Sequence, residues 1–154
     1  MRALAVAATV VVTLSLSGCG LSIPTDPDGS LARITGGILR AGASPSGELV
    51  TAVDGEVAGP LPELIEGFAR SRDARVVWTV DSEEDLVDDL AAGRLDVAVG
   101  GMTDATPWEE RVSVTRGYPG IPGSGGASVV VLLPLGENAL QSALEAYLDQ
   151  EVGG

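Results

Sequence analysis

Hydrophobic positions follow two alternating periods through the middle of the chain. Helical spacing of three to four residues appears at 61–69, with prolines confined to the first turn, and again at 82–92. Runs rich in β-branched and aliphatic residues at 38–43, 75–80 and 95–99 predict strands. The order strand, helix, strand, helix, strand predicts right-handed crossovers and a parallel sheet covered by helices.

The C-terminal part has a less regular pattern. Residues 111–115 alternate between polar and apolar, and 127–133 is an apolar run that predicts a strand. A Gly/Pro-rich stretch, 117–126, separates the two, and helical spacing returns from Leu140 to Leu148. With no internal repeat, we expect one α/β lobe over 38–150.

The N-terminus has the layout of an export signal. Arg2 supplies a positive charge, and residues 3–16 carry none. This apolar run is shorter than the roughly 20 residues that a membrane-spanning helix needs, so a cleaved signal is favoured over a membrane span. We therefore expect residues 1–18 to be a signal peptide.

The signal ends in Leu16-Ser17-Gly18-Cys19, which resembles the lipobox of bacterial lipoproteins. The resemblance implies cleavage before Cys19, thioether lipidation of that cysteine and acylation of the new amine. The alternative, a buried or disulfide-bonded cysteine, lacks a partner because Cys19 is the only cysteine. We expect the protein to be lipid-anchored at the extracytoplasmic face of the cell membrane.

The segment that follows Cys19 lacks any hydrophobic period. Residues 20–37 are rich in Ser, Pro, Asp and Gly, including the run 24–29 (PTDPDG). Such a composition is typical of a linker. We expect 19–37 to be the lipidated cysteine and a flexible tether.

Charge and composition exclude several functions. The formal net charge is −13, from 22 acidic side chains and nine basic ones, with no histidine. Nucleic acids and anionic lipids are bound by basic patches, so nucleic acid is not an expected partner. Without histidine, the chain lacks the residue that most often serves as general base and as metal ligand. All nine basic residues are arginines, so no lysine amine is available as a nucleophile. We expect no enzyme activity, no cofactor and no metal site.

Several segments together resemble the family 3 extracellular solute-binding proteins, the amino-acid-type receptors of ABC importers. They are 39–44 (LRAGAS), 59–64 (GPLPEL), 83–103 (EEDLVDDLAAGRLDVAVGGMT) and 133–139 (LPLGENA). The likeness covers the first lobe, roughly residues 38 to 116, and then resumes near Leu133. It implies one lobe of a type II periplasmic-binding-protein fold, with a mixed, mostly parallel sheet flanked by helices. It also implies a small polar solute as ligand and an ABC permease as partner.

The resemblance implies a second lobe that this chain does not contain. Family members close two lobes on a ligand, and the second lobe would add something like a hundred residues after Tyr118. Here the ten-residue loop 117–126 takes its place. We therefore expect 111–115 and 127–133 to pair as an antiparallel hairpin, and closure of two lobes on a ligand is impossible.

Candidate ligand-binding residues gather where the predicted strands end, because open α/β sheets bind ligands beyond the carboxyl ends of their strands. The resemblance implies that the Gly101 backbone and the Thr103 hydroxyl contact an amino-acid head group. In the alternative interpretation, the glycines form a tight turn and Thr103 caps it. The full set of candidates is Ser44, Gly101, Thr103, Trp108 and Arg111.

The sequence departs from the family at one ligand position. The family has an arginine within three residues of a Thr-Pro pair, and it holds the ligand carboxylate. Here that position is Glu109, which would repel a carboxylate. Arg111 could substitute, or it could form an ion pair with Glu109 or Glu110. Trp108 is a candidate for an exposed aromatic contact with the ligand.

Two further alternatives concern charge and partners. The acidic run 83–89 matches no calcium loop, so a solvated helix face is favoured over a cation site. The competing function is a single-domain surface lipoprotein that acts as a protein-interaction module without binding solute. A residual apolar patch where the second lobe would dock would favour that function.

Overall fold

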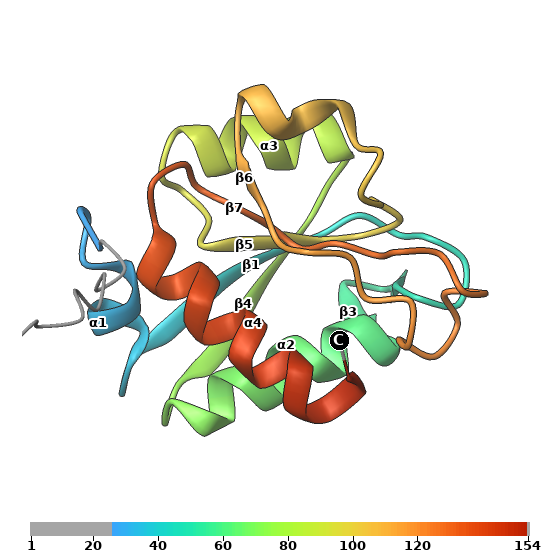
Figure 1. The fold of residues 1–154 in the computed structure, drawn as a ribbon, viewed down its shortest axis with the longest axis horizontal. Coiled ribbons are helices and arrows are strands. Elements are labelled where there is room, and N and C mark those ends of the chain that lie inside the picture. The colour runs from blue at the N-terminus through green and yellow to red at the C-terminus, as the bar shows by residue number, and fades with distance from the viewer. Residues whose placement is uncertain (1–25, 154) are drawn as a thin grey trace, which may run out of the picture.

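A computed structural model describes residues 26–153 as a mixed five-stranded sheet flanked by helices (Figure 1). The strand order is β4-β1-β5-β7-β6, with β1 (Ile38–Ala43) parallel to β4 (Arg75–Val80) and to β5 (Val97–Val99). The last two strands, β6 (Ser113–Val114) and β7 (Leu132–Leu133), are antiparallel to each other, and β7 is antiparallel to β5. This arrangement confirms the predicted fold class.

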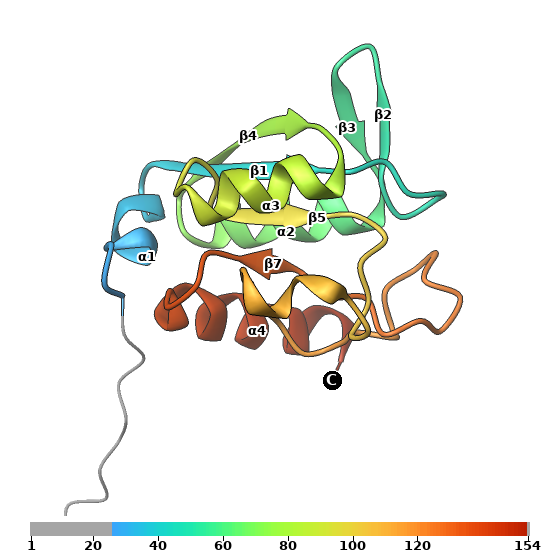
Figure 2. The same cartoon turned by 90° about the horizontal axis from the view of Figure 1, so that it is seen from above.

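Helices cover both faces of the sheet (Figure 2). One face is packed against α2 (Pro60–Ser71) and α4 (Asn138–Val152), and the other against α3 (Glu83–Ala91) and the short 3-10 helix η1 (Pro107–Glu110). The α3 helix, predicted from its apolar spacing, is capped at its N-terminus because the Ser82 side chain accepts a hydrogen bond from the Asp85 N–H at 3.2 Å.

A separate two-stranded hairpin stands beside the main sheet. It consists of β2 (Thr51–Val53) and β3 (Glu56–Ala58), joined at Asp54, which has a φ of 52°. Asp and Gly are favoured in such a turn because it needs positive φ.

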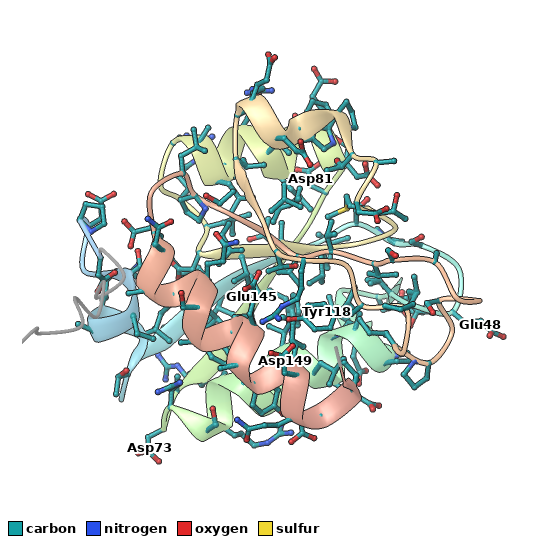
Figure 3. The ribbon with its side chains drawn as sticks, in the orientation of Figure 1. Glu48, Asp73, Asp81, Tyr118, Glu145 and Asp149 are labelled. Carbon is teal, nitrogen blue, oxygen red and sulfur yellow. The ribbon has the colours of Figure 1, made fainter. Side chains whose placement is uncertain are left out.

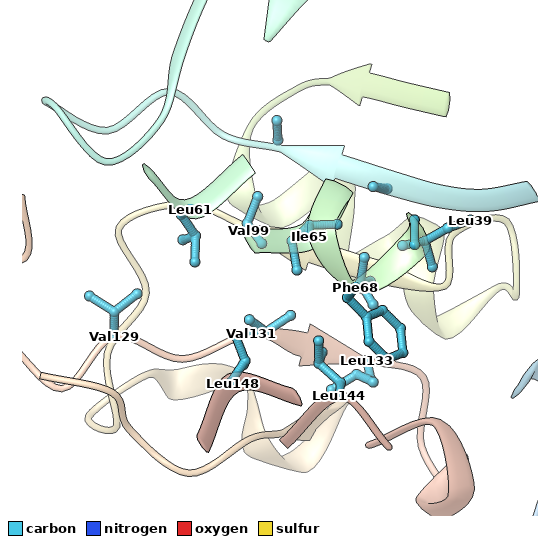
Figure 4. Packing of buried hydrophobic residues seen from close by; sticks show 14 of the residues in the cluster. Leu39, Leu61, Ile65, Phe68, Val99, Val129, Val131, Leu133, Leu144 and Leu148 are labelled. Atoms are coloured by element: carbon cyan, nitrogen blue, oxygen red, sulfur yellow. The ribbon is translucent and has the colours of Figure 1, made fainter. Parts of the chain in front are cut away.

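The larger core lies between α2, α4 and the sheet (Figure 4). Fully buried side chains from α2, such as Phe68, meet Leu144 of α4 over Val131 and Leu133. A second cluster fills the space beneath α3: Leu86, Val87, Leu90, Leu95, Ala98, Met102, Val112, Val130 and Leu132.

Gly42 of β1 allows α3 to approach the sheet closely. A Cβ at this position would lie 2.6 Å from Leu86 Cδ2 and 2.8 Å from Leu95 Cδ1. Both distances are shorter than real carbon contacts, so a side chain here would displace the buried side chains of Leu86 and Leu95.

The predicted tether is wrong at its C-terminal end. Ser30–Ile34 forms helix α1, and the Ile34 side chain is completely buried in the larger core. Leu31 also packs against that core, so apolar side chains three positions apart dock a segment whose composition resembled a linker. The earlier part of the tether, residues 19–25, lies outside the described residues, as do the signal peptide and Cys19.

Pairing of β6 with β7 confirms the predicted hairpin. The loop 117–126 that connects the two strands is packed against the rest of the protein. Tyr118 is completely buried and Ile121 is nearly so. The Tyr118 hydroxyl donates to the carbonyl of Glu145 and to Asp149, both at 3.3 Å on α4 (Figure 3). Residues 117–126 therefore contribute to the core through Tyr118 and Ile121.

Within residues 26–153, no helix has the length and apolar character required to span a bilayer.

Candidate functional site

The carboxyl ends of the three parallel strands lie in one row. The Ser44 N–H, just after β1, donates to the Val99 carbonyl of β5 at 2.9 Å. The Asp81 N–H, just after β4, donates to the Ala43 carbonyl of β1 at 3.2 Å. The segments that follow the strands therefore meet at one edge of the sheet, as predicted.

Glycines at this edge allow two segments to approach closely. A Cβ at Gly100 would lie 3.1 Å from both Cβ and the carbonyl oxygen of Ser44, and one at Gly101 would lie 2.4 Å from Ser46 Oγ. Ser44, Ser46 and Gly101 are half-buried. The structure thus brings two of the candidates, Ser44 and Gly101, into the same small area.

Thr103 is held next to this area by an antiparallel bridge to Val129. Its hydroxyl accepts a weak hydrogen bond from the Ala105 N–H at 3.4 Å, and its carbonyl accepts from Thr106 at 2.9 Å. This is the turn-capping role of the alternative interpretation. The N–H groups of Gly101 and Thr103 find no hydrogen-bond acceptor in the part of the chain that the structure describes. The geometry of Thr103 therefore fits both the turn-capping role and the ligand-binding role.

Trp108 and Arg111 contact the scaffold rather than the strand ends. Trp108 is half-buried and packs against the cluster beneath α3. Arg111 forms an ion pair with Asp88 of α3, so the alternative pairing with Glu109 or Glu110 is wrong. Arg111 reaches Asp88 because η1 lies against α3. A ligand role for Trp108 and Arg111 stays a prediction, as it does for the other candidates.

The surface around the strand ends is acidic. Glu48 in the β1–β2 loop and Asp81 after β4, both labelled in Figure 3, are exposed carboxylates, as is Asp104 directly after Thr103. Such a surface repels anions and attracts cations.

Sequence reasoning missed a buried ionic cluster at the opposite end of the strands. Asp96, just before β5, is completely buried and accepts hydrogen bonds at 2.6 Å from both Arg33 of α1 and Arg40 of β1. The Arg40 N–H also donates to Asp96 at 2.8 Å. The sequence does contain a signal for this cluster, a single acid in the apolar run 95–99. An acid in a buried strand requires basic partners, because an unpaired buried charge is costly.

These hydrogen bonds determine the ionisation of Asp96. Burial pushes its pKa upward, but the bonds from Arg40 and Arg33 outweigh burial and hold the pKa below the usual 3.8. The same carboxylate raises the pKa of Arg33. Asp96 is therefore a charged structural anchor that ties α1 to β1.

No protein-family model matches the chain, and no curated protein does either. Among solved structures, the arginine-bound form of domain 1 from TmArgBP is similar with a TM-score of 0.66 and 18% identity. The match covers 77% of this chain and 97% of that domain. The chain therefore has the fold of a single domain of a periplasmic binding protein.

Two longer structures match over part of their length. EhuB in complex with hydroxyectoine gives a TM-score of 0.52 at 19% identity, over 58% of this chain and 36% of that one. An ancestral cationic amino acid solute-binding protein gives 0.50 at 21% identity, over 58% and 40%. The chain thus spans well under half the length of these proteins, and at this identity the likeness concerns the fold alone.

Proposed function

We propose that this protein is a membrane-anchored extracytoplasmic lipoprotein of the solute-binding type, related to the receptor component of an ABC importer. The observation that carries the proposal is the carboxyl edge of the sheet, where the unused N–H groups of Gly101 and Thr103 accompany the Thr103 hydroxyl. Amides that lack an internal acceptor and lie next to a hydroxyl can bind the head group of an amino acid or a similar polar solute.

A single lobe is sufficient for some binding. Domain 1 from TmArgBP, which this chain resembles over 97% of that domain's length, has an arginine-bound form. Affinity should nevertheless be weak, because good small-molecule sites bury roughly 70–90% of their ligand and a half-cleft leaves one side in water.

The acidic surroundings favour a solute that carries a positive group. Glu48, Asp81 and Asp104 lie around the strand ends, and Glu109 stands where the family resemblance implies an arginine. Nearby carboxylates repel a purely anionic solute, so we expect basic or zwitterionic solutes to bind better than acidic ones.

Calorimetric titration tests binding. The full chain in mild detergent is titrated with arginine, glutamine and glutamate, alongside Thr103→Ala and the matched surface variant Thr35→Ala. We expect weak binding of arginine, no binding of glutamate, and at least a roughly tenfold loss in Thr103→Ala from the lost hydroxyl contact. Thr35→Ala, on the exposed end of α1, should bind as the parent does.

Two results would contradict this assignment. Micromolar or tighter binding that Thr103→Ala leaves unchanged would show that the site lies elsewhere. Binding of none of the solutes would favour the protein-interaction module instead.

The anchor is tested separately. Metabolic labelling with a fatty-acid analogue should mark the parent and not Cys19→Ala, which should leave the membrane fraction. Equal labelling of both proteins would refute lipidation at Cys19.

A further inference from the structure

Strand β4 forms an open edge of the main sheet. Its inner side pairs with β1, and nothing in residues 26–153 pairs with its outer side (Figure 2). The strand has six residues, with no proline and no lysine, whereas the strand at the other edge, β6, has only two. Long edge strands without such blocking features are suited to pairing with another strand.

The outward backbone groups of β4 can be assigned from its pairing with β1. The Arg75 N–H donates to Gly37 at 3.1 Å and the Asp81 N–H donates to Ala43 at 3.2 Å, both toward β1. Backbone N–H and C=O groups of successive residues point to opposite sides of a strand. Those of Val76, Trp78 and Val80 therefore point away from β1, at the open edge of the sheet.

The sequence of this edge is complementary to itself when read in the antiparallel direction. If two copies meet with Trp78 opposite Trp78, Val76 faces Val80, and these outward-pointing residues exchange both backbone hydrogen bonds. In the same register Arg75 faces Asp81 in both directions. A shift of the two-fold axis to Val77 would place Arg75 opposite Thr79 and lose both ion pairs.

The side chains involved are available for contact. Arg75 and Asp81 are exposed, and the Arg75 guanidinium makes no ion pair with any of the described residues. Val77, on the same face, is 49% exposed because α3 packs over β1, β5 and β7 and leaves β4 uncovered. A cavity of about 540 Å³ lies beside it, lined with Ile38 and Arg40.

We propose that the outer edge of β4 is the contact surface of a homodimer, in which two copies pair antiparallel around Trp78 and form one continuous sheet. The occupant is a second copy because the opposite charges at the two ends of the strand face each other when the strand meets itself in the antiparallel direction. The net charge of −13 on each chain opposes association, so the two Arg75–Asp81 pairs also reduce repulsion at the contact. The proposal does not depend on solute binding.

Charge reversal tests both the surface and the register. The full chain in mild detergent, at about 0.15 M salt to screen the overall repulsion, is analysed by sedimentation over a range of concentrations. Arg75→Asp or Asp81→Arg alone should raise the dimer dissociation constant roughly tenfold or more, since each turns two attractive cross-strand pairs into repulsive ones. The double variant restores both pairs and should return close to the parent value. Arg94→Asp, an exposed charge reversal away from β4, is the control.

A second experiment detects the register directly and does not depend on the affinity of the charge variants. In a mixture of Val77→Cys and Thr79→Cys proteins, a disulfide should link the two variants far more than it links either variant to itself, because only unlike positions face each other. Thermal unfolding checks that every variant is folded.

Several outcomes would overturn the proposal. These are a protein that stays monomeric at all concentrations, a dimer that no β4 variant weakens, and a double variant that is not rescued. Preferential linking of like positions would also overturn it.

Discussion

Replacing Asp96 with alanine should remove the anchor that joins α1 to the sheet. This carboxylate is completely buried, and its oxygens accept hydrogen bonds from the guanidinium groups of Arg33 and Arg40 and from the Arg40 N–H. Without it, two positive charges remain side by side and a main-chain donor loses its acceptor. Each loss destabilises the folded state.

The size of the effect depends on how far water can replace the carboxylate. Removing one partner of a fully buried ion pair costs about 3–5 kcal/mol. Here the Arg33 and Arg40 side chains are 43% and 36% exposed, so solvent recovers part of that cost. We expect the free energy of unfolding to fall by roughly 3 kcal/mol, a large share of the 5–15 kcal/mol typical of a folded domain.

The ion cluster should also appear in the acid stability of the protein. Because the folded pKa of Asp96 is lower than 3.8, its contribution is complete above that pH and is lost as the pH falls through the folded pKa. Urea unfolding of the parent and of Asp96→Asn should therefore differ most at neutral pH and converge in the acid range.

A surface ion pair provides the control. Asp89 pairs with Arg94, whose side chain is 61% exposed, so Asp89→Asn should cost less than about 1 kcal/mol. If Asp96→Ala were no more destabilising than Asp89→Asn, or if the difference between parent and Asp96→Asn did not change with pH, the reasoning would be refuted.

Three other predictions follow from buried contacts. Burial, reinforced by Asp149 and Glu145, raises the pKa of Tyr118 to about 12; stability should be complete below pH 10 and decline as the pH rises toward 12. Tyr118→Phe should reduce that decline in alkaline urea unfolding and leave only the part due to Tyr147, whose pKa burial also raises; an unchanged decline would refute the assignment. Gly42→Val should cost roughly 1–3 kcal/mol by displacing the buried Leu86 and Leu95 side chains, and an unchanged melting temperature would contradict this. Ile34→Ala should cost about 2–5 kcal/mol, whereas the same change in a true tether would cost nothing in denaturant unfolding.

The periodic elements were predictable from sequence because their signals are local. The apolar spacing of α2, the Ser82 cap of α3 and the β-branched run of β4 each report on neighbouring residues and need no knowledge of the rest of the chain. The order of these elements then limits the topology to a parallel core. The same order places the ends of β1 and β5 at one edge, which is why Ser44 and Gly101 were found together.

Other features depend on contacts between residues far apart in sequence. Asp96 lies 63 residues from Arg33, and Tyr118 lies 27 residues from the carbonyl that it contacts, so no spacing along the chain reveals either pairing. Residues 30–34 form a helix because Ile34 finds a buried place in the core, although the composition of this region resembles a linker. Arg111 pairs with Asp88 rather than with adjacent glutamates because tertiary packing sets η1 against α3. Local sequence thus determined which segments could be helices and strands, whereas burial and charge pairing across the fold decided which polar residues became part of the scaffold.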